Sequence, residues 1–61
     1  MQIYVGLGKY EDAIKCYDEI IKIKPDDAFT WYNKGIALAN LGKQEDADNC
    51  FAKAREIGFI I

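Results

Sequence analysis

The chain repeats itself with a period of 34 residues. The tripeptide Leu-Gly-Lys stands at residues 7–9 and again at residues 41–43, and Glu-Asp-Ala stands at residues 11–13 and again at 45–47. A period of this length is typical of helical hairpins stacked side by side. One such unit cannot bury its apolar face alone, so units stack and present an extended surface. The period therefore predicts an all-α fold of stacked antiparallel helical hairpins, and it favours binding over catalysis.

Length and composition restrict the chain to one small domain. A chain of 61 residues buries only roughly 60% of the surface that it exposes when unfolded. Its 51% apolar and 30% charged residues are a globular composition. Ten acidic and eight basic residues leave a net charge of -2, and no basic cluster is present to neutralise phosphates. We therefore expect no nucleic-acid partner and no membrane partner. The sequence shows no signal-peptide pattern and no long apolar run, which favours a cytoplasmic protein.

The two cysteines, Cys16 and Cys50, occupy equivalent positions of the two repeats. Stacking holds such positions about one helix spacing apart, roughly 8–10 Å, which is too far for a disulfide. The chain has no histidine and no C-x-x-C motif, so a zinc site lacks ligands. We expect two free thiols, buried or half-buried, that act as small hydrophobic groups in a reducing compartment, and we expect no metal and no cofactor. A metal or redox role is the minor alternative.

Apolar residues recur at three- and four-residue steps in three stretches of the chain. Pro25 ends the first stretch, because proline disfavours helical geometry in the residue before it, and Asp26 or Asp27 caps the second. Gly42 and Gly58 supply the stops of the second and third stretches. The predicted elements are helices over residues 10–23, 28–41 and 44–57, with residues 1–7 as the end of a preceding half-helix.

Small and aromatic residues recur at the spacing of the tetratricopeptide repeat, whose signature reads W-x2-L-G-x2-Y followed by A-x3-F. These residues are Trp31, Gly35, Ala47 and Phe51 in the second unit and Ala13 and Tyr17 in the first. The chain therefore resembles a tetratricopeptide repeat protein along its whole length. The resemblance implies a single domain over residues 1–61, with a partial first repeat at 1–27 and a second repeat with a C-terminal tail at 28–61. Phe59 departs from the family pattern, which has a closing proline there.

The signature residues have a packing role. Gly35 lets the paired helix approach closely, and the small Ala47 lies where that approach is tightest. We interpret Trp31 and Phe51 as the aromatic core of the hairpin rather than as an aromatic ligand-binding site.

The stretch over residues 28–41 carries only one charge, on Lys34. Such a helix must be covered on more than one side. The resemblance implies that the first helix of each hairpin lines a concave groove, which predicts an adaptor or scaffold that binds a peptide segment of a protein partner. Asn33 matches a groove asparagine that some family members use to hold a bound peptide, although the side chains that surround it in those members are missing here. The predicted groove wall consists of Phe29, Tyr32, Asn33, Ile36 and Asn40.

The alternative is that the first partial unit, or a second copy of the chain, covers the second apolar face. Apolar residues at both ends of the chain favour such self-association. Residues 14 and 21 are isoleucines, whereas the equivalent Asp48 and Arg55 are charged, which indicates a solvent-facing cap. The alternative function is thus a structural repeat that forms a homo-oligomer. Its predicted contact residues are Ile3, Tyr4, Leu7, Phe59 and Ile60.

A catalytic function is the least favoured interpretation of the sequence. Adjacent carboxylates occur at residues 11–12, 26–27 and 45–46, close to predicted helix starts, where acidic groups stabilise the helix dipole. Without histidine, the chain offers no catalytic constellation around these pairs. We expect a protein that is not an enzyme.

Overall fold

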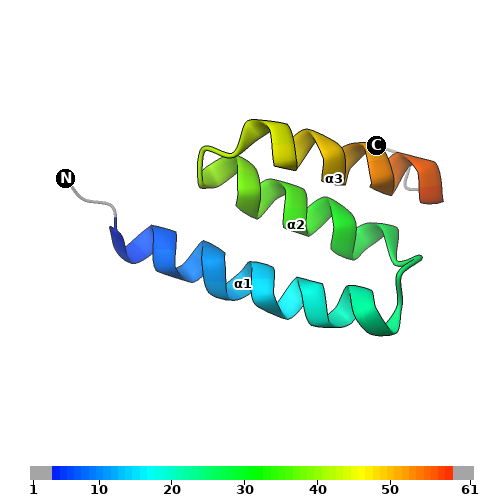
Figure 1. Cartoon of the computed structure of the whole chain (residues 1–61), viewed down its shortest axis with the longest axis horizontal. Coiled ribbons are helices and arrows are strands. Elements are labelled where there is room, and N and C mark those ends of the chain that lie inside the picture. Colours follow the sequence, from blue (N-terminus) through cyan, green and yellow to red (C-terminus); the bar gives the residue numbers. More distant parts are fainter. Residues whose placement is uncertain (1–3, 59–61) are drawn as a thin grey trace.

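The computed structural model describes the backbone of residues 4–58 and the side chains of residues 8–58. This part of the chain forms α1 (Tyr4–Ile23), α2 (Ala28–Asn40) and α3 (Gln44–Ile57). Successive helices run antiparallel, and α2 lies between α1 and α3 and packs against both (Figure 1). The prediction of an all-α fold built from helical hairpins is confirmed.

Helix α1 is one continuous helix of 20 residues. Its tripeptide Leu-Gly-Lys at residues 7–9 is helical, whereas the same tripeptide at residues 41–43 forms the α2–α3 turn with Gly42 at a φ of 85°. This corrects the expectation that residues 1–7 end a separate half-helix: residues 4–7 belong to α1, and residues 1–3 lie outside the described part. At residues 7–9 the helix simply continues, so the backbone hydrogen bonds of these residues are satisfied within α1.

The α1–α2 turn is fixed by side-chain hydrogen bonds. Asp27 caps α2, since its carboxylate accepts from the Thr30 backbone N–H at 3.4 Å and from the Thr30 hydroxyl at 2.9 Å. The Trp31 indole N–H donates to the carbonyl oxygen of Pro25 at 2.9 Å. Of the two capping candidates, Asp27 is therefore the residue that starts α2.

The α2–α3 hairpin packs through small residues. Ala47 and Ala54 of α3 are fully buried. A Cβ atom at Gly35 would lie 2.5 Å from the ring of Phe51, so α3 approaches α2 to a distance that only glycine permits there. The core consists of Leu38, Ala47 and Cys50, with the partly buried Ile14, Trp31, Ala39 and Phe51 packed against it.

The two cysteines are both free thiols but differ in exposure. Cys50 is buried at 5% exposure, whereas Cys16 is exposed. The prediction that both thiols are buried or half-buried is wrong for Cys16. The reason is that α2 covers Cys50, while no described helix covers the equivalent face of α1. Ile20 and Ile23, which follow Cys16 by one and two turns, are 39% and 79% exposed.

Candidate functional site

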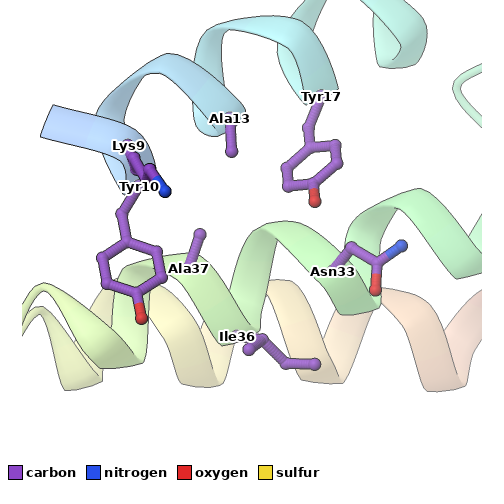
Figure 2. A pocket seen from close by; sticks show the side chains of 7 residues that line it. All are labelled: Lys9, Tyr10, Ala13, Tyr17, Asn33, Ile36 and Ala37. Carbon is purple, nitrogen blue, oxygen red and sulfur yellow. The ribbon is translucent and has the colours of Figure 1, made fainter. Parts of the chain in front are cut away.

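A hollow of about 270 Å³ lies between α1 and α2. Figure 2 shows the side chains from both helices that surround it. Tyr10 and Tyr17 lie on either side of Ala13 (Figure 2), because positions three and four residues apart share one face of a helix. The lining consists of Lys9, Tyr10, Ala13 and Tyr17 from α1 and of Asn33, Ile36 and Ala37 from α2.

Small residues on the two facing helices create the space. Ala13 of α1 and Ala37 of α2 contribute only one methyl group each, and the two tyrosine rings of α1 lie to either side of Ala13 (Figure 2). Ile36 adds apolar surface that is 40% exposed. The hollow therefore suits an apolar side chain brought by a partner.

Polar groups also surround the hollow. Lys9 provides an ammonium group and Asn33 a carboxamide that donates and accepts hydrogen bonds. Neither side chain forms a hydrogen bond or an ion pair within the described residues. Both groups are therefore available to a peptide backbone or to an acidic side chain.

The predicted wall residues divide between this hollow and its surroundings. Asn33 and Ile36 line it, whereas Phe29, at 62% exposure, and the exposed Asn40 lie on the same helix outside the lining. Tyr32 is half-buried, and its ring lies 5.4 Å from the ring of Phe51 at an interplanar angle of 47°, so it packs toward α3.

The sequence reasoning missed the contribution of α1 to the site. Lys9 and Tyr10 were not predicted as binding residues, and Ala13 and Tyr17 were predicted only as packing residues. The useful signal was the small Ala13 between two tyrosines on one helix face, next to an antiparallel partner helix. A small residue at that place leaves a gap that the neighbouring rings do not fill.

An ion pair holds α1 and α2 together next to the core. The Lys34 ammonium lies 2.6 Å from the Asp18 carboxylate and 5.8 Å from the centre of the Trp31 ring. The Lys34 side chain is 21% exposed and that of Asp18 45% exposed. Solvent therefore screens the pair, and its contribution is at most about 1 kcal/mol. The pair links the two helices that form the hollow.

Burial raises the pKa of the Cys50 thiol above its usual value. Lys34 opposes this shift, while Asp18 and Asp46 add to it. Cys50 thus lies in apolar surroundings next to negative charge, and it is a poor nucleophile at neutral pH.

The described residues contain no group of three or more His, Cys, Asp or Glu side chains arranged to hold a metal ion. Within the same part of the chain, no helix combines the length and the apolar character needed to span a bilayer.

Comparison with known families identifies this architecture. Residues 2–42 match the family described as TPR repeat, and residues 30–57 match the family described as tetratricopeptide repeat. The chain belongs to the tetratricopeptide repeat family. Together the two matches correspond to about one and a half repeats, in agreement with the three helices observed.

Several curated proteins are similar to the chain. The peroxisomal targeting signal receptor of Candida albicans is 31% identical over 62 residues, which cover 90% of this chain and 10% of the receptor. The corresponding receptor of Debaryomyces hansenii is 38% identical over 52 residues, covering 74% of this chain and 9% of the receptor. An uncharacterized protein of Methanocaldococcus jannaschii is 36% identical over 44 residues, covering 72% of this chain and 51% of that protein.

The chain spans about a tenth of the length of the receptors that it matches. No solved structure matches it significantly. The repeat family and the receptor relatives support a protein-interaction module.

Proposed function

We propose that this chain is a non-catalytic adaptor or scaffold module that binds an extended peptide segment of a protein partner. The peptide lies in the hollow between α1 and α2, called the α1–α2 groove below. The observation that carries the proposal is the hollow lined by apolar side chains from both helices and by the unengaged polar groups of Lys9 and Asn33. The receptors similar to this chain are named for a targeting signal, which supports a short peptide as the class of ligand. The free thiols are compatible with the reducing cytoplasm.

The lining suggests how such a peptide binds. An apolar side chain of the peptide enters the hollow against Tyr10, Ala13 and Ala37, which removes apolar surface from water. The Asn33 carboxamide pairs with a backbone amide of the peptide, and Lys9 favours an acidic group at that end. Ile36 and the neighbouring wall residues Phe29, Tyr32 and Asn40 extend the contact along α2.

A selection from a display library of random nine-residue peptides tests the proposal. The peptide that the intact chain enriches most is titrated against Ile36→Lys and Asn33→Ala variants. Ile23→Lys is the matched control for the first variant, because Ile23 is 79% exposed and lies outside the hollow. Gln44→Ala on α3 is the matched control for the second, because Gln44 carries an exposed carboxamide outside the hollow.

We expect Ile36→Lys to weaken the binding of the selected peptide at least about tenfold and Asn33→Ala to weaken it about fivefold. Both controls should bind the peptide within about twofold of the intact chain. Circular dichroism should show equal helicity in all four variants. If both groove variants bind as well as their controls, the peptide does not occupy this groove and the proposal is wrong.

The alternative function, self-association, has its own support. The face of α1 that carries Cys16, Ile20 and Ile23 is open, although the equivalent face of α3 is covered by α2. Of the predicted contact residues, Ile3, Phe59 and Ile60 lie outside the described part of the chain, and Tyr4 and Leu7 belong to the first turns of α1.

Sedimentation equilibrium over a concentration series distinguishes the two functions. Peptide binding by an independent module predicts a monomer at all concentrations. Self-association predicts a dimer that the Ile23→Lys substitution dissociates. Such a dimer would favour a self-associating structural repeat over a peptide-binding adaptor as the function of the chain.

A further inference from the structure

A second hollow, of about 400 Å³, lies on the other side of α2. It involves all three helices, whereas the first hollow involves only α1 and α2. Helices α1 and α3 lie on either side of α2 (Figure 1), and residues of all three helices line the hollow. Its lining consists of Ile14 from α1, Trp31, Lys34 and Leu38 from α2, and Asp46, Asn49 and Cys50 from α3.

The lining has an apolar part. Leu38 and Cys50 belong to the core, and Ile14 and Trp31 are partly buried against them. Trp31 is also held in place, because its indole N–H donates to the Pro25 carbonyl oxygen. An apolar side chain from outside would therefore contact rigid apolar groups on two sides of the hollow.

Among the charged side chains around this hollow, one carboxylate has no ion-pair partner within the described residues. Lys34 is paired with Asp18 at 2.6 Å, and Lys53, which lies 6.0 Å from the centre of the Trp31 ring, is paired with Glu56 at 3.8 Å. Asp46 forms no ion pair and no side-chain hydrogen bond within the described residues.

Asn49 stands one helical turn after Asp46 and forms no side-chain hydrogen bond there either. The Cys50 thiol responds to the negative charges of Asp18 and Asp46, which raise its pKa in addition to burial. The unengaged polar groups of this lining are thus the Asp46 carboxylate, which accepts hydrogen bonds, and the Asn49 carboxamide, which both donates and accepts them.

We propose that the hollow between α1 and α3 is a second docking surface, and that it binds a peptide segment carrying an apolar side chain next to an arginine. The apolar side chain lies against Ile14, Trp31 and Leu38. The guanidinium group donates to the Asp46 carboxylate and to the Asn49 side-chain carbonyl. This surface is complementary to basic segments, whereas the groove with Lys9 favours acidic ones, so one chain holds two peptides of opposite charge on opposite sides of α2.

The position of Asp46 offers a control for a purely structural role. Glu45 and Asp46 both lie in the first turn of α3, where acidic groups interact favourably with the helix dipole. Only Asp46 lines the hollow. Neutralising either residue removes one dipole interaction, but only the change at Asp46 removes the proposed contact.

Trp31 is the single tryptophan of the chain, so its fluorescence reports on this hollow. The probe is the capped peptide acetyl-Gly-Ser-Leu-Arg-Ser-Gly-amide, titrated against the intact chain. The matched probe has glutamate in place of arginine. The binding of both peptides is also titrated with the Asp46→Asn variant, the Glu45→Gln control and the Asn33→Ala groove variant.

We expect the arginine peptide to change the Trp31 emission with a saturable titration curve and the glutamate peptide to bind at least about fivefold more weakly. Asp46→Asn should weaken binding of the arginine peptide about fivefold, while Glu45→Gln and Asn33→Ala should change it less than about twofold.

Three results would overturn the proposal. One is the absence of a saturable change in Trp31 emission at millimolar peptide. Another is equal binding of the two probes, or equal effects of Asp46→Asn and Glu45→Gln. The third is a change of Trp31 emission with protein concentration alone, which would show that a second copy of the chain covers the hollow. None of these results bears on the α1–α2 groove, which Asn33 and Ile36 test.

Discussion

At the scale of single residues, Gly35 is the position where the α2–α3 hairpin has no room for a side chain. A Cβ atom there would lie 2.5 Å and 2.7 Å from two ring carbons of Phe51, which is closer than carbon atoms approach without displacement. Phe51 in turn packs on the Tyr32 ring. We expect Gly35→Ala to destabilise the chain by about 1–3 kcal/mol, measured by urea unfolding.

Gly8 provides the matched control for this prediction. It also lies inside a helix, its φ is not positive, and a Cβ atom added there would meet nothing within 4 Å. Gly8→Ala should stabilise the chain by up to about 1 kcal/mol, because alanine favours the helix over glycine. If the two substitutions change the free energy of unfolding equally, the close approach of α3 at Gly35 is not what makes that position sensitive.

At the scale of the helices, the start of α2 depends on Asp27. Its carboxylate accepts two hydrogen bonds from Thr30, a residue with 6% exposure. Asp27→Ala removes both side-chain hydrogen bonds and leaves the Thr30 hydroxyl without its carboxylate partner, while the Thr30 backbone N–H still donates to the main-chain carbonyl of residue 27 at 3.1 Å. The substitution should cost about 1 kcal/mol of stability in thermal or urea unfolding. Asp26→Ala is the control, since Asp26 is exposed and does not cap α2. An equal loss in both variants would show that general charge near the helix start, rather than the cap, is responsible.

The helices also show which parts of the fold the sequence predicts. The end of α1, both ends of α2 and the end of α3 follow from local chemistry, because Pro25, Asp27, Gly42 and Gly58 act within a few residues of themselves. The start of α3 at Lys43 has no side-chain cap. The length of α1 does not follow in this way. Leu-Gly-Lys is a turn at residues 41–43 and helix at residues 7–9, so the tripeptide by itself does not determine its conformation.

At the scale of the whole molecule, the helices that pack around a residue determine whether it is buried, even where two residues occupy the same repeat position. Cys16 and Cys50 occupy the same repeat position, yet one is exposed and the other is buried. Asn33 and Ile36 line the hollow between α1 and α2, whereas Trp31 and Leu38 line the hollow on the other side of α2. The α1 half of the site was missed, because the hollow also depends on Ala37 of another helix, which lies near Ala13 only in the folded chain.

The most direct test of groove binding is the set of intermolecular nuclear Overhauser effects between the selected peptide and the methyl groups of the isotopically labelled chain. Binding in the α1–α2 groove predicts contacts from the peptide to the methyl groups of Ala13, Ile36 and Ala37, which line the hollow. Contacts confined to Ile20 and Ile23 on the open face of α1, with none to these three residues, would contradict it.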